Sequence, residues 1–280
     1  MIPGVRVERI PCGEVSLEVA RIGEGPPTIF LHGFPEAWIS WRHQMKAFAD
    51  AGRTAIAPNL RGYGNSDKPR RTSDYRLNRL AGDIAGLAKA LGHDSIDLVG
   101  HDWGGIIAYD VAARFPKLVR KLAILNAPHI RVMMRALVRD PDQRRRSWYV
   151  FAFQLPMLPE RAIMKPDFLD RVIRKTAVHP ERFDDESLAA IQAVVQSPGT
   201  PKAAVSYYRA ARAPSFCRDV VQAQTLVIWG EQDHALGTAL LEGIDRHVRH
   251  TRIRRIPDAG HFVQQDAPEE VSQALLQFFA

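Results

Sequence analysis

The 280-residue sequence is poor in cysteine, with Cys12 and Cys217 far apart in the chain. Two isolated thiols argue against a disulfide framework and against a cysteine-rich metal site. No run of about 18 apolar residues is present, which argues against a membrane span. Residues 1–10 also lack the apolar core of a secretory signal. From these absences we expect a cytoplasmic protein without a membrane span.

The net charge of +7 is concentrated in one segment of the chain. Residues 129–220 contain 16 Lys or Arg and 10 Asp or Glu, whereas the rest of the chain contains 22 and 21. This excess is typical of a solvated helical surface, and an anionic partner is the alternative. Neither a zinc-binding spacing nor an interleaving of aromatic and basic residues supports nucleic-acid binding.

Apolar periodicity predicts an alternation of strands and helices. The expected strands are 5–10, 15–22, 28–31, 54–58, 96–99, 119–125, 225–229 and 251–256, and the expected helices are 41–51, 77–91, 106–115, 238–248 and 269–279. The first two strands predict a hairpin at a sheet edge. The repeated order of strand then helix predicts an α/β fold, with a mainly parallel twisted sheet and helices on both faces.

This alternation stops between residues 129 and 220. Arg-rich helical patterns there are interrupted by prolines, and no strand is predicted. We therefore expect a core domain formed by residues 1–128 and 221–280, with residues 129–220 inserted as a helical cap.

The stretch Gly100-His101-Asp102-Trp103-Gly104-Gly105 follows an apolar strand and precedes an apolar helix. This is the pattern of a nucleophile elbow, written G-x-D-x-G in place of G-x-S-x-G. The sharp turn strains the backbone at Asp102, and side chains at Gly100 and Gly104 would collide with it. A helix N-terminus also favours a carboxylate at this point. Alternatively, Asp102 is only an N-cap residue.

Two further polar side chains follow later strands, Asp233 after residues 225–229 and His261 after residues 251–256. The order Asp102, Asp233, His261 is that of α/β hydrolases, with Asp in place of the nucleophilic Ser. A carboxylate is charged at pH 7 and needs no base to attack a saturated carbon that carries a leaving group. His261, oriented by Asp233, would then activate water to hydrolyse the alkyl ester on Asp102. This chemistry needs no cofactor and no metal.

The loop after residues 28–31, His32-Gly33-Phe34-Pro35-Glu36-Ala37-Trp38, lies where α/β sheets bind ligands. The backbone N–H groups of Phe34 and Trp103 are the candidate oxyanion hole. The alternative is a tight turn with a cis Phe34-Pro35 bond that serves shape alone.

Together with Arg61-Gly62-Tyr63-Gly64 and the elbow, this loop resembles the epoxide hydrolases of the α/β-hydrolase superfamily over nearly the whole chain. The resemblance implies that two cap tyrosines protonate the epoxide oxygen. Tyr149, before Phe153-Gln154-Leu155-Pro156, and Tyr208, in Ser206-Tyr207-Tyr208-Arg209, resemble them. A one-residue slip would exchange Tyr208 for Tyr207, and packing aromatics in the cap are the alternative for both.

The expected reaction is the opening of an epoxide to a vicinal diol, with a small apolar epoxide and water as the substrates. Trp38, Phe153 and Phe262 are the expected substrate-binding residues. The oligomeric state is left open, with a homodimer as one alternative.

Two alternatives use the same fold. A haloalkane or haloacetate dehalogenase shares the Asp–His–Asp chemistry, and Trp103 would help to hold a halide; Phe34, however, stands where haloalkane enzymes commonly have Asn. A non-catalytic binding protein of the same fold tends to lose a member of the triad, and all three are present here.

Overall fold

One eight-stranded sheet organises the computed structural model, which describes residues 2–213 and 215–280. The strands are β1 (Arg6–Pro11), β2 (Ser16–Ile22), β3 (Pro27–Leu31), β4 (Thr54–Pro58), β5 (Ile96–His101), β6 (Val119–Leu125), β7 (Val221–Gly230) and β8 (Val248–Ile256). Their order in the sheet is β1-β2-β4-β3-β5-β6-β7-β8. The hairpin β1–β2 and the β2–β4 pair are antiparallel, and the other neighbours are parallel. The predicted edge hairpin and mainly parallel sheet are confirmed.

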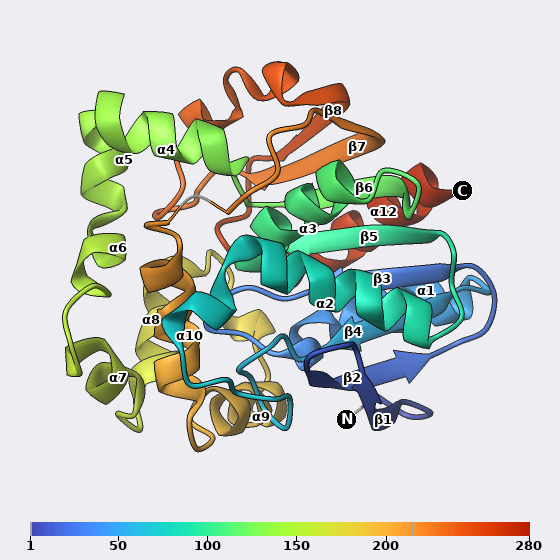
Figure 1. Cartoon of the computed structure of the whole chain (residues 1–280), viewed down its shortest axis with the longest axis horizontal. Coiled ribbons are helices and arrows are strands. Elements are labelled where there is room, and N and C mark those ends of the chain that lie inside the picture. Colours follow the sequence, from blue (N-terminus) through green and yellow to red (C-terminus); the bar gives the residue numbers. More distant parts are fainter. Residues whose placement is uncertain (1, 214) are drawn as a thin grey trace.

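Helices cover both faces of this sheet (Figure 1). On one face lie α2 (Leu77–Ala90) and α3 (Trp103–Arg114), and on the other α1 (Arg42–Asp50) and α12 (Pro268–Phe279). The central strand β5 is buried along its whole length because both of its faces are covered. Short elements complete the core: η1 (Trp38–Trp41), η2 (Thr72–Tyr75) and α11 (Val263–Asp266).

The predicted helix over 238–248 is wrong. Two 3₁₀ turns, η4 (Thr238–Leu241) and η5 (Ile244–Arg246), take its place. Gly243 between them has a φ of +76°, a left-handed conformation that an α-helix does not tolerate. The following strand therefore begins at Val248, three residues earlier than predicted.

Residues 129–220, here called the cap segment, connect β6 to β7 and contain no strand among their described residues. Their helices are α4 (Ile130–Arg139), α5 (Pro141–Arg146), α6 (Trp148–Ala152), α7 (Leu158–Ile163), α8 (Phe168–Thr176), η3 (Pro180–Arg182), α9 (Asp185–Val195) and α10 (Thr200–Ala210). The cap segment has its own apolar cluster, which also contacts Ile39 and Phe262 of the core. Figure 1 shows it at one end of the sheet, where the ends of several strands meet.

Candidate active site

Asp102 lies in a strained turn between β5 and α3. Its backbone has a φ of +49° and a ψ of −120°, which non-glycine residues rarely adopt. The neighbouring glycines leave the space that this turn requires. A Cβ at Gly100 would lie 2.4 Å from the carbonyl oxygen of Gly104, and one at Gly104 would lie 2.1 Å from that of Leu31. These contacts are the predicted collisions, so the geometry is that of a nucleophile elbow.

The carboxylate of Asp102 is held by the backbone on one side. The N–H of Phe34 donates to its Oδ1 at 2.9 Å, and the backbone N–H of Trp103 acts with it to lower the pKa of this carboxyl. Both predicted oxyanion-hole donors therefore face the same group. Burial raises the pKa of Asp102, against which His261, His101 and the two backbone donors act to lower it.

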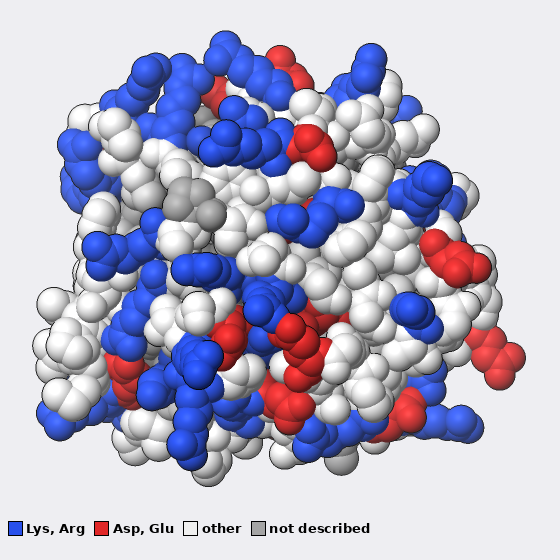
Figure 2. All heavy atoms as spheres, in the orientation of Figure 1, with Lys and Arg blue, Asp and Glu red and all other residues white. Residues whose placement is uncertain are grey.

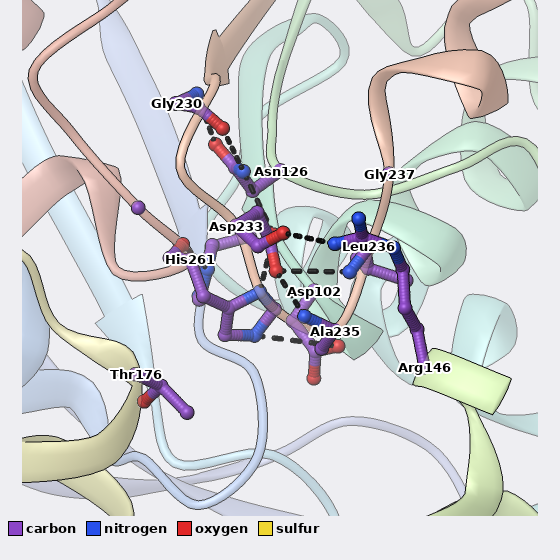
Figure 3. A network of polar contacts seen from close by, with 12 residues as sticks. Asp102, Asn126, Arg146, Thr176, Gly230, Asp233, Ala235, Leu236, Gly237 and His261 are labelled. Atoms are coloured by element: carbon purple, nitrogen blue, oxygen red, sulfur yellow. Dashed lines mark hydrogen bonds and ion pairs between the residues drawn. The ribbon is translucent and has the colours of Figure 1, made fainter. Parts of the chain in front are cut away.

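His261 connects the two aspartates (Figure 3). Its Nδ1 lies 2.8 Å from Oδ2 of Asp233, and its Nε2 lies 3.9 Å from Oδ2 of Asp102. The second distance is too long for a direct hydrogen bond. Burial opposes the charged imidazolium, but Asp233 and Asp102 outweigh it and raise the pKa of His261 to about 9. Burial likewise opposes ionisation of Asp233, yet His261 and the backbone N–H of Leu236 hold its pKa below the usual value.

Asn126, which sequence reasoning missed, fixes Asp233 from the neighbouring strand end. Its Nδ2 donates to Oδ2 of Asp233 at 2.9 Å, and its Oδ1 accepts from the N–H of Gly230 at 2.8 Å. It is one of three non-glycine residues with a positive φ in the described chain. Its place directly after β6 was the available signal, because side chains that follow parallel strands meet at one edge of the sheet.

A buried pair, Glu36 and His101, connects two loops of the site. The sequence analysis did not identify this pair. His101 Nδ1 lies 2.6 Å from Oε2 of Glu36, and His101 Nε2 lies 2.8 Å from the carbonyl oxygen of His261. Glu36 in turn accepts from the N–H of Gly33 at 3.0 Å. The pair therefore links the Phe34 loop to the loop that carries His261. In the sequence, Glu36 and His101 appear only as single polar residues within two separate motifs, and nothing there indicates that they pair.

The two predicted tyrosines reach the site from the cap segment. The ring of Tyr208, on α10, packs at centroid distances of 5.0 Å from Trp103 and 4.7 Å from Phe153. Tyr149, on α6, lies 6.1 Å from Tyr208. Burial raises the pKa of both phenols, and the charge of Asp102 raises it further. Both groups therefore stay protonated at neutral pH.

The side chain of Tyr207 points toward Arg61 and not toward Asp102. Its hydroxyl donates to the carbonyl oxygen of Arg61 at 2.7 Å, and its ring packs against Tyr63 and Tyr75. The neighbouring residue Tyr208, not Tyr207, is the one that lines the space above Asp102.

Two cavities meet at Asp102, Tyr149 and Tyr208. The His-side cavity, of about 560 Å³, is bounded by the aromatic side chains of Phe34, Phe153, Phe168 and Phe262 and by His261. The Trp-side cavity, of about 580 Å³, is bounded by Trp103 and by apolar side chains, among them Ile106, Ile130, Met133, Met134, Leu137 and Phe151. A ligand whose central atom reaches Asp102 has apolar space on both sides.

The structure brings together most of the predicted site, with one correction. Phe153 and Phe262 line the His-side cavity as expected. Trp38 lines neither cavity. Its partly buried side chain packs instead against the apolar cluster of α1 and α12 and against the cluster of the cap segment.

The described residues contain neither a metal-ligand cluster nor a membrane-spanning helix. Within residues 2–213 and 215–280, no three His, Cys, Asp or Glu side chains are grouped as metal ligands. No helix of the described chain combines the length and the apolar character that crossing a bilayer requires.

The comparisons with known proteins agree with this geometry. The family described as the alpha/beta hydrolase fold matches residues 26–268. The chain is 33% identical to the AB hydrolase superfamily protein YfhM of Bacillus subtilis, over 98% of both chains. It is 38% identical to epoxide hydrolase 3 of Xenopus tropicalis, over 90% of this chain and 71% of that protein.

Solved structures give the same result. An epoxide hydrolase of Bacillus megaterium in complex with an inhibitor superposes with a TM-score of 0.87 at 28% identity, over 98% of this chain and 99% of that one. The fold and the elbow define the class, an α/β hydrolase with an aspartate at the nucleophile position. The chain belongs to the epoxide hydrolase family of the α/β-hydrolase superfamily.

Proposed function

We propose that the protein hydrolyses apolar epoxides to vicinal diols through an alkyl ester on Asp102. The observation that carries this proposal is the position of Asp102, which faces His261 on one side and two phenols, Tyr149 and Tyr208, across the cavities. The names of the relatives support the same reaction. Residues 129–220 serve as the cap that supplies the phenols.

Ring opening is the first step. Oδ2 of Asp102 attacks one carbon of the epoxide, because Oδ1 is held by the N–H of Phe34. The carbon–oxygen bond of the ring breaks, and its electron pair stays on the oxygen. An alkoxide is a poor leaving group, so Tyr149 or Tyr208 donates a proton to that oxygen as the bond breaks.

Ester hydrolysis is the second step. His261 Nε2 takes a proton from a water molecule, whose oxygen attacks the ester carbon of Asp102. The charge that develops on Oδ1 is stabilised by the N–H groups of Phe34 and Trp103. Collapse of this intermediate passes its hydroxyl proton to the leaving oxygen, which releases the diol, restores the carboxylate and leaves His261 protonated as in the free enzyme.

The first step prepares His261 for the second. In the free enzyme, the charge of Asp102 is among the causes that raise the pKa of His261. Forming the ester removes this negative charge. The imidazolium then gives its proton to the phenolate that the first step left, which supplies the neutral base that the water requires.

A substrate panel and a trapping experiment test the proposal together. The enzyme is incubated with styrene oxide and, in parallel, with 1-bromobutane, while diol and bromide are both measured. We expect diol and no bromide. Rapid bromide release with inert epoxides would identify a dehalogenase instead.

The trapping experiment uses the variant His261→Gln with styrene oxide, analysed by intact mass. We expect a covalent adduct of the mass of enzyme plus epoxide, because alkylation does not need the imidazole. A variant that turns over slowly without ever carrying an adduct would contradict the two-step route. The matched control is Asp102→Asn, which should give no adduct.

A further inference from the structure

The outer edge of the cap segment exposes an unusual number of large apolar side chains. Eight of the eleven that the described residues expose lie between positions 134 and 164: Met134, Val138, Trp148, Phe151, Leu155, Met157, Leu158 and Met164. Trp148 is 68% exposed and Met157 is 62% exposed. They belong to α4, α6 and α7, to the turn between α6 and α7, and to the residue after α7, which together form the outer edge of the cap segment in Figure 1. We call this surface the docking face.

The docking face is also cationic. Residues 130–165 contain eight Lys or Arg and three Asp or Glu. The three acids already have partners: Asp140 accepts from the N–H of Asp142, Asp142 pairs with Arg145 and Arg146, and Glu160 pairs with Arg209. Seven of the eight cations are exposed and Arg146 is half-buried, and Figure 2 shows blue and white spheres with few red ones along this edge.

The same surface borders both openings of the site. Trp148 and Ala162 line the His-side cavity, and Met134 and Phe151 line the Trp-side cavity. A partner that covers the docking face therefore also contacts residues that line both cavities.

We propose that the docking face binds to the surface of an anionic lipid bilayer. Helices that combine exposed Trp, Phe, Leu or Met side chains with Lys and Arg lie in bilayer interfaces, where anionic lipids attract the cations. A second copy of this chain fits less well, because pairing two such faces brings like charges together. Lipid binding does not depend on the reaction; only the entry of epoxides from the bilayer rests on the proposed function.

Co-sedimentation with vesicles, without substrate, tests the proposal. One set of vesicles contains phosphatidylcholine and phosphatidylglycerol, and the other contains phosphatidylcholine alone. We expect binding to the anionic vesicles, weakened by 0.5 M salt because screening reduces the attraction. Absence of binding to anionic vesicles overturns the proposal.

Two sets of variants locate the bound surface. Leu155→Gln, Met157→Asn and Leu158→Gln together remove exposed apolar side chains that line neither cavity. Asn suits position 157, whose φ is +64°. We expect vesicle binding to fall about ten-fold or more. Arg161→Gln with Lys165→Gln should weaken it about five-fold per cation.

Matched controls lie on the sheet, away from α7. Arg249→Gln with Arg252→Gln removes the same charge from β8, and Val7→Thr with Ile253→Thr removes exposed apolar side chains from β1 and β8. Binding should be unchanged in both. An equal loss in the controls would overturn the docking face as the contact.

Two further readouts complete the test. Hydrolysis of dissolved styrene oxide should stay at the parental rate in all of these variants, which separates a failure of docking from a failure of the proposed function. Analytical ultracentrifugation decides between lipid and self-association. A dimer that the triple apolar variant dissociates would assign this face to a second copy and overturn the proposal.

Discussion

The core and the cap segment hold their parts of the site by different means. In the core, Asp233 accepts hydrogen bonds at both oxygens, from the N–H groups of Ala235 and Leu236 at Oδ1 and from Asn126 and His261 at Oδ2. In the cap segment, Tyr149 and Tyr208 are positioned mainly by ring packing against other aromatic residues.

This difference follows from charge. A buried carboxylate is costly unless hydrogen bonds and an opposite charge compensate it, so the core must supply several donors at fixed positions. Burial costs a neutral phenol much less than it costs a carboxylate, so aromatic packing can position most of the side chain. The apolar lining of the cap segment can therefore vary without disturbing the hydrogen bonds that hold Asp233 in the core, and four predictions examine this difference.

The largest effect is expected in the core. Asp102→Asn keeps the shape of the side chain but removes the nucleophile, so kcat should fall about 10⁴-fold or more. The midpoint of thermal unfolding should stay close to that of the parent, which shows that the elbow still forms. Measurable alkylation of the Asn variant in a single-turnover assay, with its mass confirmed, would remove Asp102 from the mechanism.

The next largest effect is expected in the cap segment. Changing Tyr149 and Tyr208 together to Phe keeps both rings but removes both acids, so the rate of ring opening should fall about 10²- to 10⁴-fold. Stopped-flow measurement of the alkylation step checks this. Because the acids act on the oxygen of the epoxide, hydrolysis of an ester already formed should change little. Retained ring opening would show that the phenols only pack.

The third prediction uses pH to measure how much the Asp233–His261 pair of the core stabilises the fold. The pKa of His261 is raised from 6.5 to about 9 in the folded protein, so the folded state binds this proton more tightly than the unfolded chain does. The resulting stabilisation is fully present below pH 6.5 and is lost as the pH rises through 9. Relative to His261→Gln, the parent should lose about 3 kcal/mol of unfolding free energy over this range.

Urea unfolding at several pH values measures that loss. Tyr149→Phe serves as the control from the cap segment and should keep the parental pH dependence, because it leaves the Asp233–His261 pair intact. Equal pH dependence in the parent and in His261→Gln would mean that this pair does not stabilise the fold.

The smallest effect compares two neighbouring residues of α10. Tyr207→Phe removes the hydrogen bond to the carbonyl oxygen of Arg61, so the unfolding free energy should fall by about 1–2 kcal/mol. Its kcat should stay within about three-fold of the parent, because Tyr207 lines neither large cavity. Tyr208→Phe should show the reverse, with a lower kcat and little change in stability. A lower kcat in Tyr207→Phe together with a lower stability in Tyr208→Phe would mean that the two residues have the opposite roles.

Most of the core could be predicted because its signals are local. The turn at Asp102 requires glycine at 100 and 104, and the positions after strands place Asp233 and His261 at the same edge of the sheet. The helix predicted over 238–248 does not form, because Gly243 takes a left-handed conformation that apolar spacing does not reveal. The contacts of Asn126 and of the Glu36–His101 pair were not predicted, because the side chains that they join are distant in the chain.

The sequence by itself determined the elbow, the order of the catalytic candidates and the mainly parallel sheet, since each depends on neighbouring residues and on their periodicity. Only the tertiary structure decided that Tyr208 and not Tyr207 faces Asp102, and that Trp38 packs against two apolar clusters outside both cavities. Both outcomes depend on how one element docks against another. The rotation of α10 is set by contacts such as the bond from Tyr207 to Arg61, which joins residues 146 positions apart.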